Sequence, residues 1–112
     1  MKTYVSVTGL TLKPELEKYA AGKLARISRR IPRKYRAQAD FQIELKRAVA
    51  KDTKHNTCGI VLSFDGVELR AQETTQHMYA ALDICAVQIE SQLKSHLQEN
   101  RLGLLHRLKR AG

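Results

Sequence analysis

Basic side chains crowd one stretch of this 112-residue chain, and they are residue types that could bind a polyanion. Every charged residue from position 18 to 36 is a cation: Lys18, Lys23, Arg26, Arg29, Arg30, Arg33, Lys34 and Arg36. Solvated helix faces normally mix both signs of charge, so this unbalanced run favours contact with nucleic acid over simple solvation. We therefore predict that RNA phosphates contact this segment.

A second basic group lies at the C-terminal end, where cations and leucines are interleaved. The residues are Arg101, Arg107, Lys109 and Arg110, with Leu102, Leu104, Leu105 and Leu108. Two interpretations stay open for the cations, a disordered solubilising end or an RNA-binding extension. The leucines could dock on the domain, on another protein or on a membrane surface.

Residues suited to catalysis do not gather into any recognisable motif. His55 and Cys58 form an isolated HxxC, far short of the four ligands of a structural zinc site. The two cysteines, Cys58 and Cys85, lie inside apolar periodic segments and lack CxxC spacing, so we expect reduced core thiols. Glycines form no phosphate-binding loop motif. We expect no enzyme activity, no cofactor, no metal and no small-molecule substrate.

The overall composition agrees with a nucleic-acid partner. Lysine and arginine number 20 against 11 acidic residues, for a formal net charge of +9 and a pI near 9.9. Aromatic content is only 5%, so contacts to phosphate and to folded RNA shape are favoured over base stacking. No apolar run of membrane-spanning length exists, and the start MKTYVSVTGL lacks a signal-peptide core. We expect a cytoplasmic protein without a membrane partner.

The first elements follow from hydrophobic periodicity. Alternating residues predict a strand over 3–8, and helical spacing of apolar residues predicts a helix from Pro14 to Arg30. Pro14 suits the first helical position, and Pro32 disfavours continuation of the helix. On a helical projection most of the basic residues fall opposite or beside the apolar stripe, so the exposed side of this helix is expected to be basic.

Alternation then predicts three further strands, over 38–47, 58–64 and 67–73, which form an antiparallel meander. The polar segment 48–56 is interpreted as a loop. Asp65-Gly66 is a strong hairpin turn between the last two strands. One face of this sheet is expected to stay in contact with water.

A final helix is predicted from an apolar stripe through Met78, Leu82, Cys85, Ile89 and Leu93, with an end or a bend at Gly103. The element order β-α-β-β-β-α favours an α+β fold in which two helices pack on one face of a four-stranded sheet. We predict one domain over residues 1–98 and a basic, leucine-bearing tail over 99–112.

Residues 74–83, TTQHMYAALD, closely resemble the strand-to-helix junction of the family of ribosome hibernation-promoting factors and ribosome-associated translation inhibitors. The opening VSVTG, the helix LEKYAAGKLARI, the three-strand meander and the Asp-Gly turn before VELRAQ are also similar to that family. The resemblance covers residues 2 to about 97. The chain ends before the extra C-terminal dimerisation domain of long members would begin, so it resembles a short form.

The resemblance implies a domain similar in shape to double-stranded RNA-binding domains that lodges in the messenger channel of the small ribosomal subunit. There it would overlap the tRNA and messenger sites and inhibit translation by occlusion. In the family, basic side chains of both helices contact ribosomal RNA, and the lysines of the family's motif in the first helix match Lys23 and Arg26 in the predicted helix over 14–30. Together with charge placement, this gives the predicted RNA-binding set Lys18, Lys23, Arg26, Arg29, Arg30, Arg33, Lys94 and Arg101.

The sequence also departs from the family pattern. An aspartate that usually precedes MYAA is His77, and positions of the final helix that are commonly basic are Gln88, Ser91 and Ser95. The final helix is therefore expected to bind RNA less tightly, with Arg29, Arg30 and Arg33 compensating. Its expected exposed side carries Ile84 and Val87, either as scattered surface residues or as a partner surface.

Two other functions stay open at this point. The chain could be a general binder of structured RNA, with the same basic helix against any A-form minor groove. It could also be a protein-interaction module that uses the leucine-rich tail with Ile84 and Val87, while its charge only steers the encounter. We expect a monomer when free. Whether it pairs ribosomes or keeps them single is left open by the resemblance.

Overall fold

The computed structural model describes the backbone of residues 2–111 and the side chains of residues 2–98. It has an α+β fold with the predicted order of strands and long helices, plus one short extra helix. The elements are β1 (Lys2–Thr8), α1 (Pro14–Arg30), α2 (Arg33–Arg36), β2 (Asp40–Ala50), β3 (Thr53–Phe64), β4 (Val67–Thr75) and α3 (Met78–Ala111).

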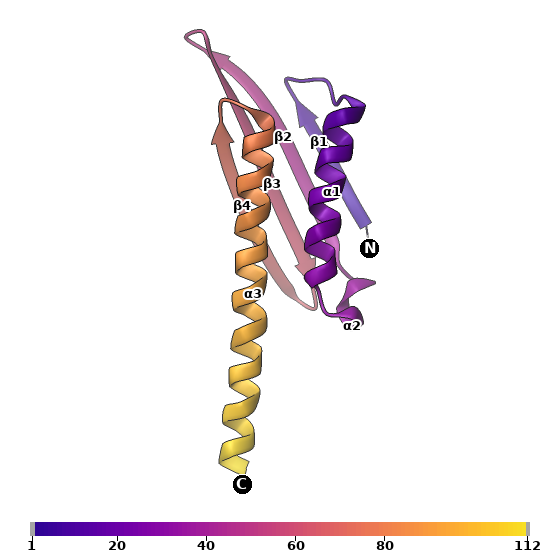
Figure 1. Cartoon of the computed structure of the whole chain (residues 1–112), viewed down its shortest axis with the longest axis vertical. Helices are drawn as coiled ribbons and strands as arrows, with labels where there is room; N and C mark the ends of the chain where they lie inside the picture. Colours follow the sequence, from indigo (N-terminus) through magenta and orange to yellow (C-terminus); the bar gives the residue numbers. More distant parts are fainter. Residues whose placement is uncertain (1, 112) are drawn as a thin grey trace.

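The four strands form one sheet in the order β1-β2-β3-β4. β1 runs parallel to β2, which requires a crossover connection, and α1 supplies it. β2, β3 and β4 pair antiparallel as the predicted meander. Figure 1 shows α1 and α3 side by side on one face of this sheet. The predicted two-layer arrangement is confirmed.

The core lies between the sheet and the two long helices, α1 and α3. Its residues are those that the strand and helix periodicities of the sequence predict to be buried. Strand residues two apart and helix residues three or four apart contribute the buried side chains. The fully buried large residues include Ile27, Ile31, Phe41, Leu45, Ile60, Leu62, Leu82, Ile89 and Leu93. β1 is less buried, since Val5 is 50% exposed at the edge of the sheet.

Helix α1 has the predicted bounds, and local chemistry explains both ends. Pro14 stands at the start, where its missing amide donor costs nothing. After the last helical residue, Arg30, the chain turns extended before Pro32. The guanidinium of Arg36 then donates to the carbonyl oxygens of Arg29 and Ile31, both at 3.2 Å. This cation therefore satisfies carbonyl groups at the C-terminal end of α1.

The predicted loop over residues 48–56 is wrong, because the two strands continue through it. Ala50 pairs with Thr53, and the register runs without a break to Asp40 and Ser63. Lys51 and Asp52 make a two-residue turn with positive φ angles of 51° and 62°. Such turns match the twist of a hairpin, but they usually contain Gly or Asn, and Lys51-Asp52 lacks both, so residue types alone do not predict this turn.

Helix α3 continues to Ala111 and does not end at Gly103, where the sequence predicted an end or a bend. A single glycine costs a helix only about 1 kcal/mol, which does not by itself stop it. The side chains of Arg101 and of the leucine-bearing tail lie outside the described residues. The division at residue 98 stays a prediction.

Gly9 is the glycine on which the approach to α1 depends. Its φ of +76° is a conformation that side chains disfavour, and a Cβ atom there would lie 2.1 Å from the carbonyl oxygen of Arg47. Gly9 directly follows the pairing of Thr8 with Lys46, so the start of the loop before α1 lies against the backbone of β2. Gly22, on the exposed side of α1, has no such contact within 4 Å.

We expect Gly9→Ala to lower the free energy of unfolding by about 2 kcal/mol or more, through left-handed strain and the clash with Arg47. Gly22→Ala should instead raise it by up to about 1 kcal/mol, because alanine is the better helix former. Urea unfolding followed by circular dichroism measures both. A Gly9→Ala protein as stable as wild type would show that the close approach to Arg47 is absent.

Candidate nucleic-acid interface

The predicted RNA-binding residues with described side chains gather on one surface of the helical layer, which we call the basic face. It consists of Lys18, Lys23, Arg26, Arg29 and Arg30 of α1, Arg33 of α2 and Lys94 of α3. Lys94 follows Glu90 by one helical turn, so it lies on the side of α3 that turns toward α1. Arg101, the last of the predicted set, lies outside the described side chains.

Lys23 takes part in a polar cluster that joins the two helices. Its Nζ lies 2.9 Å from Oδ1 of Asp83, and the Tyr19 hydroxyl donates to the same oxygen at 2.5 Å. Hydrogen bonds from Tyr19 and Lys23 hold the pKa of Asp83 below its usual value, and the Asp83 bond raises the pKa of Lys23. The Tyr19 ring also packs edge-to-face on Tyr79 of α3, with centroids 4.8 Å apart.

Arg26 and Arg30 share a second carboxylate of α3. Their Nε atoms lie 3.2 Å and 3.7 Å from the two oxygens of Glu90. The sequence showed no carboxylate within the basic run, but α3 brings Asp83 and Glu90 beside it. Three of the predicted RNA-binding cations are thus ion-paired, although the side chains of Arg26 and Arg30 stay 60% and 51% exposed.

The remaining cations of the basic face are unpaired. Lys18, Arg29, Arg33 and Lys94 are exposed, and among the described side chains no carboxylate lies within ion-pair distance of them. These side chains keep their full charge available to a polyanion. Two of them belong to α1, one to α2 and one to α3.

Helix α2 is fixed against the rest of the domain by aromatic contacts. The Tyr35 ring lies 5.9 Å from that of Phe64, which in turn meets His96 of α3 edge-to-face at 6.0 Å. His96 is half-buried, as expected for a boundary imidazole. Lys34 lies over the Tyr35 ring at 4.9 Å. Arg33 is therefore presented by a docked helix and not by a free loop.

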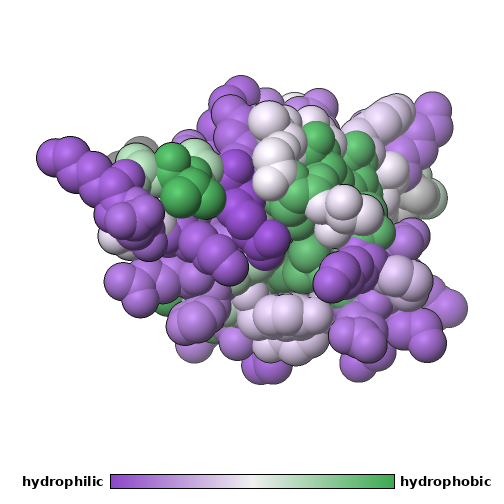
Figure 2. All heavy atoms as spheres, turned by 90° about the horizontal axis from the view of Figure 1, so that it is seen from above, coloured by the Kyte–Doolittle hydropathy of each residue, from purple (hydrophilic) through white to green (hydrophobic). Residues whose placement is uncertain are grey.

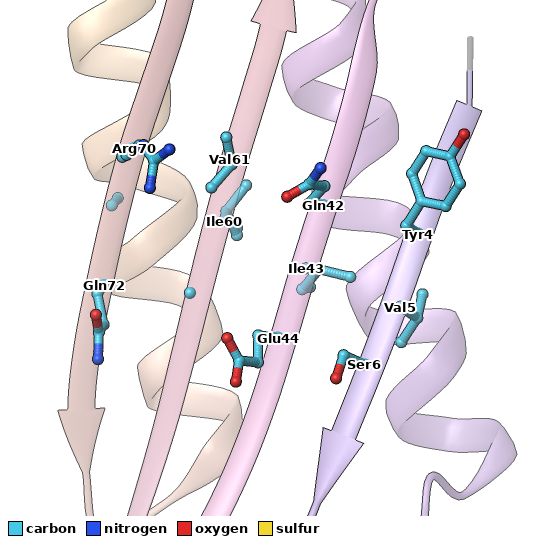
Figure 3. A pocket seen from close by; sticks show the side chains of 12 residues that line it. Tyr4, Val5, Ser6, Gln42, Ile43, Glu44, Ile60, Val61, Arg70 and Gln72 are labelled. Atoms are coloured by element: carbon cyan, nitrogen blue, oxygen red, sulfur yellow. The ribbon is translucent and has the colours of Figure 1, made fainter.

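The opposite face of the sheet has a different character. Figure 3 shows a shallow hollow there, lined by side chains of all four strands, among them Tyr4, Gln42 and Gln72. Two ion pairs lie within this face, Glu44 with Lys46 at 2.8 Å and Glu68 with Arg70 at 3.0 Å. We call this surface the open sheet face. Paired charges of both signs offer little attraction to RNA phosphates.

Other chemistry that the sequence raised finds no support among residues 2–98. Cys58 and Cys85 are buried free thiols, and the neighbouring thiol together with burial raises the pKa of Cys58. Within this part of the chain no three His, Cys, Asp or Glu side chains are placed to hold a metal ion. No described helix is long and apolar enough to cross a membrane. Ile84 and Val87 are exposed, as expected.

Comparisons with known proteins agree with the family that the sequence resembles. Residues 4–101 match the family model described as sigma-54 modulation protein / S30EA ribosomal protein. A ribosomal subunit interface protein from Coxiella burnetii superposes with a TM-score of 0.70 at 20% identity, covering 88% of this chain and 99% of that one. The N-terminal domain of Thermus thermophilus Protein Y superposes with a TM-score of 0.65 at 22% identity, and the match covers 86% of this chain and 99% of that one. Among curated proteins no match was found.

The Asp83 cluster yields a prediction about pH. The pKa of Asp83 is lower in the folded protein than in the unfolded chain. The Asp83 carboxylate therefore stabilises the fold at pH values above its pKa in the unfolded chain, and this stabilisation is lost as the pH falls through its pKa in the folded protein. We expect Asp83→Asn to cost less than about 1 kcal/mol at pH 7, the range of partly exposed ion pairs. The difference from wild type should vanish in acid.

Urea unfolding at pH 7 and below pH 3 tests this. Asp52→Asn is the matched control, since Asp52 is exposed in a hairpin turn whose positive φ suits asparagine equally well. A stability difference between the Asp83 variant and wild type that is the same at both pH values would contradict the ion-pair explanation.

Proposed function

The chain belongs to the sigma-54 modulation protein / S30EA ribosomal protein family, and we propose that it binds the small ribosomal subunit in the messenger and tRNA decoding channel and blocks translation there by occlusion. As a member of this family it is a ribosome-associated hibernation or modulation factor. Its site of action would be the cytoplasm, and it would act as a monomer without catalysing a reaction.

The observation that carries the proposal is the difference between the two faces of the domain. Among the described side chains, the basic face has cations without carboxylate partners in α1, α2 and α3, whereas Glu44, Lys46, Glu68 and Arg70 of the open sheet face form two ion pairs of opposite charge. Ribosomal RNA attracts a surface of unpaired cations because each phosphate contact releases counterions. We infer that the basic face turns toward the RNA.

The ion pairs between the helices support the same orientation. Asp83 and Glu90 hold Lys23, Arg26 and Arg30 in fixed positions, so little side-chain freedom is lost when RNA binds. Arg26 and Arg30 keep unused N–H donors on their exposed guanidinium groups. Arg29, Arg33 and Lys18 then supply the unpaired charge around this ordered centre.

Cosedimentation with vacant small subunits and with whole ribosomes over a salt series is the decisive experiment, with excess messenger and initiator tRNA as competitors. Saturable one-to-one binding that the competitors abolish is the expected result. Weak, unsaturable binding that any duplex RNA matches would instead favour a general binder of structured RNA.

We expect the double variant Arg29→Glu/Arg33→Glu to weaken ribosome binding by tenfold or more and to flatten its salt dependence, with the slope of log K against log salt falling by about two. Neither residue has an ion pair among the described side chains, so folding should be unaffected. Filter binding or cosedimentation at several salt concentrations provides the slope.

The control is Lys46→Glu/Arg70→Glu, which changes the net charge equally but on the open sheet face. If both double variants lost affinity to the same extent, overall charge and not the basic face would govern binding. Loss of every partner after truncation behind Gln98, with RNA affinity retained, would favour a protein-interaction module that uses the tail.

A further inference from the structure

A second basic site lies at the end of the domain where α1 and α3 begin. A hollow of about 420 Å³ opens there between three segments that are far apart in the sequence. They are the loop before α1, the β2–β3 hairpin and the junction of β4 with α3. Figure 2 looks onto this end of the molecule, where hydrophobic residues lie exposed between hydrophilic ones. None of the predicted RNA-binding residues lines it.

The hollow forms where the inner face of the sheet changes from apolar to polar. Phe41, Ile43 and Leu45 alternate inward along β2, and Arg47 takes the next inward position. An arginine under the ends of two helices loses part of its hydration, a cost that a carboxylate partner normally offsets. Arg47 is half-buried, and no described carboxylate lies within ion-pair distance of it.

A buried asparagine holds this arginine in place. Arg47 Nε donates to Oδ1 of Asn56 at 2.7 Å, and the Asn56 amide donates to the carbonyl oxygen of Gln76 at 2.8 Å. Asn56 is only 2% exposed, so the orientation of the guanidinium is fixed from inside the domain. The bond uses Nε alone and leaves the amino groups of Arg47 for a ligand in the hollow.

Further cations line the same hollow. Lys54 enters from β3, Lys13 from the loop before α1, and His77 from the β4–α3 junction. Glu15 is the one carboxylate among the lining residues, and it pairs with none of these cations in the described structure. The lining therefore carries a net positive charge. The Arg47 guanidinium at its centre is held in place, whereas the side chains of Lys54 and Lys13 at its rim can adjust to a ligand.

We propose that this hollow binds a phosphate group, with Arg47 as the fixed donor and Lys54 and Lys13 as the charges at its rim. The planar guanidinium matches two phosphate oxygens at once, and the lysines add point charges. The same chemistry is offered by a phosphodiester of RNA and by the phosphates of a free nucleotide. The inference does not depend on the proposed function, because it uses different residues.

Nuclear magnetic resonance on the isotopically labelled full chain tests the site with two probes, inorganic pyrophosphate and a short RNA duplex. We expect saturable shifts of the backbone signals of Lys54, Gln76 and His77 with at least one probe. Arg47→Gln should weaken that binding about tenfold or more, the usual effect of losing a charged hydrogen bond. Lys54→Gln should lower the salt slope of RNA binding by about one.

Lys46→Gln is the matched control, because Lys46 is the neighbour of Arg47 on β2 and points to the opposite face of the sheet. It should leave the shifts unchanged. Lys54 is exposed with no hydrogen bond in the described structure, so its variant keeps the test valid even if Arg47→Gln reduces stability. Thermal unfolding of each variant checks this.

The outcomes separate the two sources of phosphate. Shifts with the duplex alone assign the hollow to RNA, and shifts with pyrophosphate at lower concentration than with the duplex assign it to a free nucleotide. The proposal is overturned if neither probe causes saturable shifts. It is also overturned if Lys46→Gln weakens probe binding as much as Arg47→Gln does. Where the wild-type protein responds to pyrophosphate, Arg29→Glu/Arg33→Glu should respond equally, because neither residue lines the hollow. This variant therefore distinguishes failure of the phosphate-site proposal from failure of the ribosome-binding proposal.

Discussion

One apolar sheet face is shared by two helices, and the position of every charged group on the helical layer depends on how they pack there. Ile27 of α1 and Ile89 of α3 are completely buried against the strands. Burying one such side chain stabilises a fold by about 1.5–3 kcal/mol, whereas a partly exposed ion pair contributes less than about 1 kcal/mol. Hydrophobic packing therefore sets the distance between the helices, and the ion pairs form because that distance allows them.

The ion pairs then divide the cations into two kinds. Lys23, Arg26 and Arg30 are held by Asp83 and Glu90, which lowers the local excess of charge but fixes three donors in space. Arg29 and Arg33 keep their charge unshared. A surface with only unpaired cations would bind any polyanion, and one with only paired cations would attract none. The combination suits a folded RNA surface, where geometry and charge both count.

Periodicity in the sequence predicted most of the fold, because strands and helices bury residues at different fixed intervals. Pro14 and Pro32 predicted the bounds of α1. The Asp65-Gly66 pair predicted the turn between β3 and β4, because Asp-Gly is a favoured hairpin turn. The Lys51-Asp52 turn was missed because it lacks the usual glycine or asparagine. The pairing of Lys23 with Asp83 was missed for another reason, since the two are distant in the sequence and only packing brings them together.

The same limit explains why the sequence did not reveal the hollow around Arg47. Alternation places Arg47 in line with Leu45, and such a position could equally mark the end of a strand's buried part. Three contacts define the surroundings of Arg47. Gly9 lets the loop before α1 start against the Arg47 backbone, Asn56 orients the guanidinium, and Gln76 ties Asn56 to the start of α3. Buried polar groups are retained when their bonds are satisfied, and this chain of bonds satisfies Asn56 while it leaves part of Arg47 unused. Asn56 orients Arg47 from inside the domain, and no described carboxylate neutralises its charge. A ligand explains this arrangement better than stability alone.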